Sequence, residues 1–251
     1  MKIIVYPDKE ALALALGDLI IDSVKAKPNL ILGLPGEIFT EPFFFLTLDR
    51  LFTAVVRNEV AFGQTRFFAT HEFMGLDLQN PLSNASNLWK RVLKPIEVLP
   101  RNIFLLDGNA PDPEFECLKY ESKIKWLGGI ELQLLTLGVR GEIARNEMAS
   151  SLGSRCRLQI LYPEHFTGDH RFTATNQPRS VLTMGVASLM EAKRVVITAS
   201  GTDHANAVAR CFDGPVSSAA PASAFQGHPS CTVFLDRTAA SYCRASRGIP
   251  L

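Results

Sequence analysis

Apolar segments of strand length alternate with amphipathic segments of helix length along the whole chain. This alternation constrains the fold more than any other feature of the sequence. It predicts an α/β fold in three layers, with a mostly parallel sheet covered by helices on both faces. No change of composition and no Pro/Ser-rich linker interrupts the pattern, so we expect a single domain over residues 1–251. The strands are expected at 2–6, 29–35, 65–70, 102–108, 130–138, 194–201 and 231–236, and the helices at 7–27, 41–59, 83–96, 113–129, 180–193, 202–212 and 220–228.

The charge and cysteine content narrow the possible partners. A formal net charge of +1 in 251 residues gives no electrostatic reason to bind nucleic acid or an anionic membrane. No uninterrupted apolar run reaches the roughly 18 residues that a membrane-spanning helix requires. The chain has five cysteines and none of them forms a CxxC pair, which is typical of reduced thiols. We therefore expect a cytoplasmic protein, with no nucleic-acid or membrane partner.

Four polar loops follow expected strands and are the candidates for a site. In open α/β sheets, ligands bind outside the carboxyl ends of the strands. The loops are GLPGEIFTEP (33–42), THEFMGLD (70–77), LGVRGEIARNE (137–147) and SGTDHANA (200–207).

These loops, in this order, resemble those of the glucosamine-6-phosphate deaminase family. Three further stretches are similar to segments of that family in the same order: RNEMASSLGSR (145–155), LTMGVASLMEAKRVVITASG (182–201) and PASAFQGHPSCTVFLD (221–236). The resemblance runs nearly from end to end. It implies a Rossmann-like fold, shared with ribose-5-phosphate isomerase-like and 6-phosphogluconolactonase proteins.

The resemblance also implies a reaction. Such enzymes open the ring of an aminosugar phosphate, move a proton between C2 and C1, and release ammonia. A carboxylate moves the proton, and a histidine held by carboxylates handles ring opening. A Gly/Thr loop, a lysine and an arginine hold the phosphate. The implied partner is therefore a small-molecule sugar phosphate, and we expect neither a cofactor nor a metal ion.

Several catalytic positions of the family carry other residue types in this chain. The proton-moving aspartate corresponds to His71, followed by Glu72 as in the family. The aspartate and histidine of the ring-opening loop correspond to Arg140 and Glu142, whereas the supporting glutamate is retained as Glu147. The family's tyrosine after Glu72 is Phe73, and its phenylalanine two positions before Glu147 is Arg145.

The two acid/base positions have thus changed type in opposite directions. An imidazole has an ordinary pKa near 6.5, so His71 is suited to general base catalysis near neutral pH. Glu142 would need a pKa raised by burial or by a like charge. Glu147 would raise the pKa of Glu142, whereas Arg140 and Arg145 would lower it. Two hypotheses stay open: an exchanged but active pair, or replacements in a site that no longer does chemistry.

The phosphate loop also departs from the family. Gly36 and Thr40 keep the character of the family's loop, whereas Glu37 and Glu41 add carboxylates beside them. A carboxylate about 5 Å from a phosphate charge costs about 3 kcal/mol at an effective dielectric near 20, or roughly a hundredfold in affinity. Unless both glutamates face away, this loop binds phosphate poorly.

Two further residues are candidates for phosphate binding. Arg171 stands where the family has a phosphate-binding arginine, and a guanidinium suits bidentate phosphate contacts. The family's phosphate lysine corresponds to His204, which carries a full charge only below its pKa.

Three functions follow from these observations. The first is an aminosugar-6-phosphate isomerase/deaminase with altered acid/base residues. The second is a catalytically inactive homologue that acts in binding or assembly. The third is a hydrolase like 6-phosphogluconolactonase, against which Glu142 counts. The resemblance allows either a monomer or a homo-oligomer.

Overall fold

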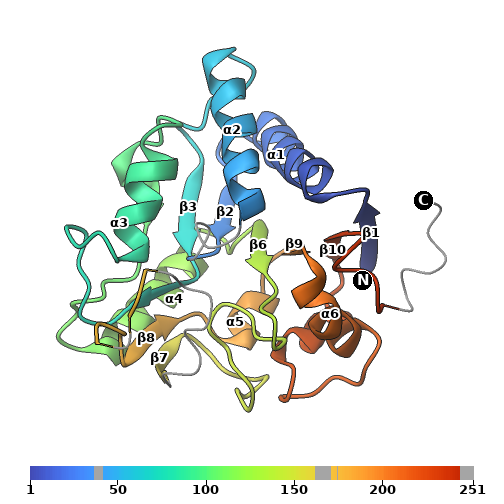
Figure 1. Cartoon of the computed structure of the whole chain (residues 1–251). Helices are drawn as coiled ribbons and strands as arrows, with labels where there is room; N and C mark the ends of the chain where they lie inside the picture. Colours follow the sequence, from blue (N-terminus) through green and yellow to red (C-terminus); the bar gives the residue numbers. More distant parts are fainter. Residues whose placement is uncertain (37–41, 162–170, 174, 244–251) are drawn as a thin grey trace.

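The computed structural model describes residues 1–36, 42–161, 171–173 and 175–243, and is built around a seven-stranded sheet (Figure 1). Its strands run parallel in the order β1-β10-β9-β6-β2-β3-β5. The predicted α/β fold with a mostly parallel sheet is therefore confirmed. The strands are β1 (Lys2–Tyr6), β2 (Ile31–Leu34), β3 (Arg66–Ala69), β5 (Ile103–Phe104), β6 (Leu132–Thr136), β9 (Val195–Ala199) and β10 (Cys231–Asp236).

Helices cover both faces of this sheet. Successive residues of β9 show the two faces, because Val196 packs into one hydrophobic core while Val195 and Ile197 pack into the other. The first core contains α1 (Lys9–Ala26), α2 (Pro42–Val56) and the segment formed by α3 (Asn84–Leu88) with the π-helical turn Trp89–Leu93. The second contains α4 (Pro113–Trp126), α5 (Val186–Met190), α6 (Ala205–Phe212) and the 3-10 helix Pro221–Gly227. Shorter 3-10 turns span Pro100–Asn102 and Thr202–His204.

Local sequence explains where the long helices begin. Asp8 caps α1, because its side chain accepts a hydrogen bond from the Ala11 amide, as the sequence predicts. Asp112 caps α4 in the same way through the Phe115 amide, and Pro113 suits the first helical position. Ser83 caps α3 through the Ser86 amide.

A second, antiparallel sheet is a correction to the sequence analysis. It consists of β4 (His71–Phe73), β8 (Ser180–Thr183) and β7 (Arg157–Ile160), with β8 in the middle. The single helix expected at 180–193 is therefore wrong. Its first residues pair with two strands, and a helix begins only after Gly185, whose extended backbone forms the N-cap of α5. Tertiary pairing outweighs the helical spacing of the apolar residues here.

The two sheets meet at the end of β3. Thr70 follows β3 directly, and its carbonyl accepts a hydrogen bond from the Met184 amide, just after β8. His71 then pairs with Thr183 at the start of β4. The chain therefore turns from the large sheet into the small one at Thr70. Among the helices that the structure describes, none is both long and apolar enough to cross a membrane.

Candidate active site

The four candidate loops meet at one edge of the large sheet. They follow β2, β3, β6 and β9, which are consecutive in the strand order β9-β6-β2-β3. Parallel strands place their carboxyl ends at the same edge, so the four loops converge there. Thr40, Glu37 and Glu41 of the first loop lie outside the described residues.

His71 follows β3 at this edge and is almost completely buried. The hydroxyl of Thr70 hydrogen-bonds Nδ1 of His71 at 2.9 Å, and the Gly36 amide donates to the same hydroxyl oxygen at 3.0 Å. A β-carbon at Gly36 would lie 2.9 Å from both Cε1 and Nε2 of His71. The loop after β2 and the histidine after β3 are therefore in direct contact.

Two arginines surround the aromatic ring next to His71. Phe73 is fully buried, and its ring centroid lies 6.2 Å from that of His71. The guanidinium carbons of Arg145 and Arg171 lie 5.3 and 5.8 Å from the Phe73 centroid. Guanidinium groups at such distances are attracted by the face of the ring. The fold thus brings Arg145 and Arg171, from two distant loops, to the ring of Phe73.

Residues at the start of α3 also hold the Arg171 side chain in place. Its Nη1 donates to Oδ1 of Asn84 at 2.8 Å and to the Leu82 carbonyl at 3.2 Å. Its guanidinium also lies 5.3 Å from the ring of Phe172. The position of a phosphate-binding arginine, which the resemblance predicts, is therefore anchored next to His71 and Phe73.

Glu72 has a structural environment. Its buried carboxylate accepts four hydrogen bonds, from the amides of Phe73, Asn84 and Ala85 and from the hydroxyl of Ser83, at 2.6 to 3.1 Å. Burial raises the pKa of Glu72, although these hydrogen bonds act to lower it. Both oxygens are used to join β4 to the start of α3. These contacts are those of a residue that holds β4 against the start of α3, and the catalytic role predicted for Glu72 stays a prediction.

Glu142 turns back into its own loop. Its Oε2 accepts a hydrogen bond from the Arg140 amide at 2.8 Å, and its carboxyl group covers Gly138. A β-carbon at position 138 would lie 2.1 Å from Cδ of Glu142, so the Glu142 side chain can keep this position only against a glycine. The carbonyl of Arg140 accepts a hydrogen bond from the Arg210 side chain. The loop therefore holds Glu142 half-buried, and its predicted role in ring opening stays a prediction.

The second half of the same loop carries unusual backbone conformations. Ala144 and Arg145 both have positive φ, at 48° and 62°. Such backbone is strained for residues other than glycine and persists only where the surroundings fix it. Thr183 donates its hydroxyl to the Ala144 carbonyl, which connects the loop to the strand partner of His71. This conformation places the Arg145 side chain against Phe73.

Asn146 fixes the position of Glu147. The Asn146 side chain is fully buried and donates to the carbonyls of Ile143 and Met184 at 2.9 Å. Arg157 in turn donates to Oδ1 of Asn146 at 2.8 Å. Glu147 follows it in the chain and is buried. The sequence analysis did not identify Asn146, although its position inside RNE was the available clue.

His204 and Asp236 lie at the ends of β9 and β10. His204 is buried in the 3-10 turn after β9. Asp236 accepts hydrogen bonds from the hydroxyl of Ser200 and the amide of Gly201, which hold that turn in place. Burial acts to raise the pKa of Asp236, but its hydrogen bonds outweigh burial and the pKa is lowered. Neither Asp236 nor Thr70 was identified from the sequence.

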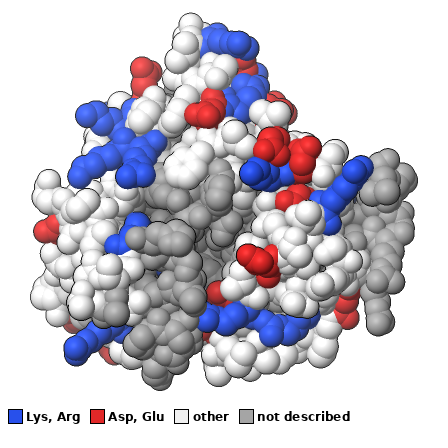
Figure 2. Space-filling model, in the orientation of Figure 1, with Lys and Arg blue, Asp and Glu red and all other residues white. Residues whose placement is uncertain are grey.

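The site contains titratable side chains but no evident metal centre within the part of the chain that the structure describes. In those residues, no group of three or more His, Cys, Asp or Glu side chains is arranged to hold a metal ion. Charges of both signs are interspersed over the face of the molecule seen in Figure 2.

The fold and the position of the site define the class of this protein. It is a three-layer α/β protein whose candidate site lies at the carboxyl ends of four central strands. Solved 6-phosphogluconolactonases share its fold. One from Trypanosoma brucei has a TM-score of 0.71 at 18% identity, with 99% of this chain and 98% of that chain covered. At this identity the likeness concerns the fold alone.

Within this class, the chain belongs to the glucosamine-6-phosphate deaminase family. A glucosamine-6-phosphate deaminase of Hahella chejuensis is 36% identical over 243 residues, which cover 96% of this chain and 91% of the relative. One of Streptomyces coelicolor is 33% identical over 244 residues, or 96% and 92%. A solved monomeric glucosamine-6-phosphate deaminase has a TM-score of 0.90 at 30% identity, with 96% of this chain and all of that chain covered. No protein-family model matches the chain.

Proposed function

We propose that this chain is an aminosugar-6-phosphate deaminase and isomerase in which His71 transfers the proton between C2 and C1. One observation supports this above the others: the buried imidazole of His71 is held through Nδ1, with its Nε2 edge against Gly36. Family membership supplies the reaction class, and this geometry supplies a base. The substrate is a small sugar phosphate. A cytoplasmic location and a homo-oligomer stay predictions of the sequence.

Thr70 selects the useful tautomer of His71. Its hydroxyl oxygen has two lone pairs and can accept from both the Gly36 amide and Nδ1–H of His71. In that tautomer Nε2 carries a lone pair. Nε2 would then remove the proton from C2 of the ring-opened sugar and return it to C1. A neutral imidazole performs this step without the pKa shift that a carboxylate base needs.

Arg171 and Arg145 would hold the phosphate. Arg171 is the arginine that the resemblance assigns to phosphate, and its contacts with Asn84 and Leu82 fix its direction. Arg145 adds a second guanidinium at the same aromatic ring. His204 would donate a further hydrogen bond from the end of β9. Together these groups would offset the carboxylates that the first loop has acquired.

Ring opening would fall to Glu147 and Glu142. Glu147 is the retained carboxylate, buried next to Asn146. Glu142 accepts a hydrogen bond from the Arg140 amide through one oxygen. Protonated on its other oxygen, it would donate that proton to the ring oxygen of the sugar and become a carboxylate.

A second function rests on a specific observation. The residues predicted to be catalytic are His71, Glu72, Glu142 and Glu147. The carboxylates of Glu72 and Glu142 accept hydrogen bonds from groups of the protein itself. A site whose carboxylates serve structure is compatible with an inactive homologue that binds a sugar phosphate without converting it.

One experiment separates the two functions. Ammonia release and ketose-phosphate formation are measured with glucosamine-6-phosphate and galactosamine-6-phosphate, for the wild type, His71→Asn and Glu142→Gln. Glu114→Gln is the matched control, because Glu114 is exposed on α4. Turnover that His71→Asn abolishes while the control retains it supports a deaminase. Absence of turnover with both sugars, together with a thermal shift on adding them, supports the binding homologue.

A further inference from the structure

Asn84 is a buried side chain beside Arg171 that uses only half of its carboxamide. It is 0% exposed, and its Oδ1 accepts a hydrogen bond from Nη1 of Arg171 at 2.8 Å. Its Nδ2 has no hydrogen-bond partner among the residues that the structure describes. We propose that Asn84 is a further substrate-binding residue, whose Nδ2 donates a hydrogen bond to the phosphate group that Arg171 holds. This inference rests on the proposed function, from which it takes the sugar phosphate and the role of Arg171.

The chemistry of the contact fixes the orientation of the Asn84 carboxamide. A guanidinium group has only donors, so the atom of Asn84 that contacts Arg171 must be the oxygen, and the other atom is the NH₂ nitrogen with its two donors. In a carboxamide, the nitrogen lies about 2.2 Å from the oxygen. Nδ2 of Asn84 therefore lies at most about 5 Å from Nη1 of Arg171.

Donors this close to each other can bind one phosphate group. A phosphate monoester has three terminal oxygens that accept hydrogen bonds, with donor–acceptor distances of about 2.7–2.9 Å for charged pairs. One oxygen can then accept from Arg171 while another accepts from Asn84. Arg171 is half-buried, so a ligand can approach the pair from the side of the guanidinium.

The backbone holds Asn84 in place without using its Nδ2. The amide of Asn84 donates to Oε1 of Glu72 at 3.1 Å. Its neighbours Ser83 and Ala85 donate to the same carboxylate. A donor that is fixed in a buried position without an acceptor destabilises the folded chain. A bound phosphate that supplies the acceptor accounts for this donor.

A second asparagine on the same helix shows the contrast. Asn87 lies one turn later in α3, and its Nδ2 donates to the carbonyls of Pro81 and Ser83 at 2.7 and 2.8 Å. Its amide group is therefore used by the local structure. The same substitution at the two asparagines thus separates a structural donor from a ligand-binding one.

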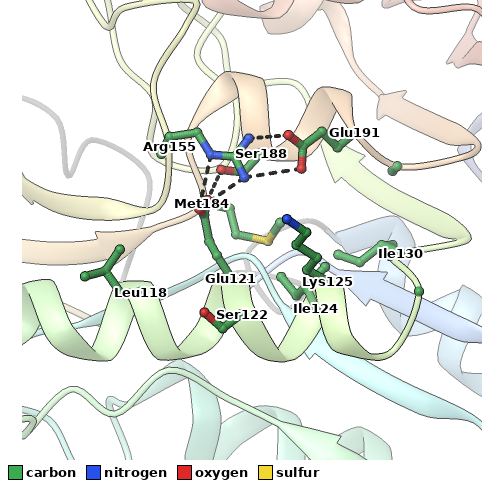
Figure 3. Close-up of a pocket in the computed structure, with 13 residues that line it drawn as sticks. Leu118, Glu121, Ser122, Ile124, Lys125, Ile130, Arg155, Met184, Ser188 and Glu191 are labelled. Carbon is green, nitrogen blue, oxygen red and sulfur yellow. Dashed lines mark hydrogen bonds and ion pairs between the residues drawn. The ribbon is translucent and has the colours of Figure 1, made fainter.

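Another pocket with cationic side chains lies between α4 and α5 and has a volume of about 660 Å³. Its charged side chains are Arg155, Lys125, Glu121 and Glu191 (Figure 3). Arg155 forms ion pairs with both carboxylates, at 3.1 Å with Glu121 and at closer range with Glu191. The two cations only balance the two carboxylates, so this pocket offers no net positive charge to a phosphate. Lys125 is therefore a control position for the test.

The test uses purified full chains. Binding of inorganic phosphate is measured by isothermal titration calorimetry, and kcat and KM by ammonia release from glucosamine-6-phosphate. If the wild type shows no turnover, glucosamine-6-phosphate itself is titrated in the calorimeter.

Two substitutions at Asn84 remove the donor in different ways. Asn84→Asp keeps an oxygen toward Arg171 and places a carboxylate about 5 Å or less from the phosphate, which should weaken phosphate binding and raise KM about a hundredfold. Asn84→Ala removes the hydrogen bond without adding a charge and should have an effect of about tenfold. In both variants kcat should stay near the wild-type value, because the phosphate contact is the same before and during the reaction.

The matched controls are Asn87→Asp and Lys125→Gln. Both should bind phosphate with wild-type affinity and keep the wild-type KM. Asn87→Asp should instead lower the unfolding midpoint, because the carbonyls of Pro81 and Ser83 lose their donor.

The outcomes separate this inference from the proposed reaction. Wild-type affinity in Asn84→Ala or Asn84→Asp would overturn the inference and leave the reaction standing. No binding by the wild type, or equal weakening in Lys125→Gln, would also overturn it. A wild type that releases no ammonia but binds glucosamine-6-phosphate more tightly than Asn84→Ala would support the inference and refute the reaction. Asn84→Ala adds no charge to the core, so the test remains decisive if Asn84→Asp does not fold.

Discussion

The imidazole of His71 occupies the space that a side chain at position 36 would need. A β-carbon on Gly36 would lie 2.7 Å from the His71 carbonyl oxygen and 2.9 Å from its Nε2. Contacts shorter than 3.0 Å require one partner to move, and the carbonyl belongs to the backbone of β4. The absence of a side chain at Gly36 is thus what permits His71 to stand at the centre of the site.

Gly36→Ala should therefore displace the His71 ring and reduce turnover. We expect kcat/KM for ammonia release to fall by about a hundredfold, since small misplacements of a catalytic group have effects of this size. Overpacking should also lower the free energy of unfolding by about 1–3 kcal/mol. Gly227→Ala is the matched control, because a β-carbon there has no neighbour within 4 Å. Unchanged turnover in Gly36→Ala would contradict His71 as the base.

Glu72→Gln tests whether Glu72 is structural. The amide NH₂ group of glutamine would face donors that now bind a carboxylate, such as the Ala85 amide and the Ser83 hydroxyl. We expect the free energy of unfolding to fall by about 1–3 kcal/mol, measured by urea denaturation. Exposed Glu114→Gln should change it by less than about 0.5 kcal/mol. Full stability of Glu72→Gln with a loss of turnover would instead return Glu72 to a catalytic role.

Most of the large sheet could be predicted because its strands are continuous apolar runs bounded by helices. β2 and β9, for example, are buried along their whole length, and such runs have few alternatives. The convergence of the four loops followed from the same pattern. The small sheet was missed because its strands are short and pair only through distant parts of the chain. The spacing of apolar residues at 180–183 also fits a helix. Only the pairing of these residues with β4 and β7 determines that they form a strand.

The site was predictable by position but less so by role. His71 and Arg171 both lie beside Phe73 and Glu147 is buried in the loop after β6, and the roles that the resemblance implies for them stay predictions. The hydrogen bonds of Glu72 depend on the packing of α3 against β4, and no local sequence pattern predicts this tertiary contact. The contact of Arg145 with Phe73 depends on positive φ at Arg145, although no glycine in that part of the loop indicates a left-handed turn.

Arg145→Phe, which restores the residue type of the family, should change both substrate affinity and pH dependence. Removal of the guanidinium near Phe73 should raise KM about tenfold if Arg145 contacts the phosphate. A nearby cation disfavours protonated imidazole, so its loss raises the pKa of the base. The acid limb of the kcat/KM profile should then move to higher pH. Arg145→Lys keeps the charge and should leave that limb in place. Identical kcat/KM–pH profiles for the wild type and Arg145→Phe would show that Arg145 does not act in the site.

Asp236→Asn should reduce stability in a pH-dependent way. The folded-state pKa of Asp236 is lowered from 3.8, because hydrogen bonds from Ser200, Ala239, Thr238 and Gly201 outweigh burial. A carboxyl whose pKa falls on folding stabilises the protein above its unfolded pKa, and that stability is lost as the pH falls through the folded pKa. At pH 7 we expect Asp236→Asn to lose about 2 kcal/mol. In urea denaturation at decreasing pH, the difference from wild type should narrow below about pH 4. Exposed Asp22→Asn should show no such difference. If the difference in unfolding free energy between wild type and Asp236→Asn stays constant down to acidic pH, the charge of Asp236 does not contribute to stability. The effect would then come from the shape of the side chain.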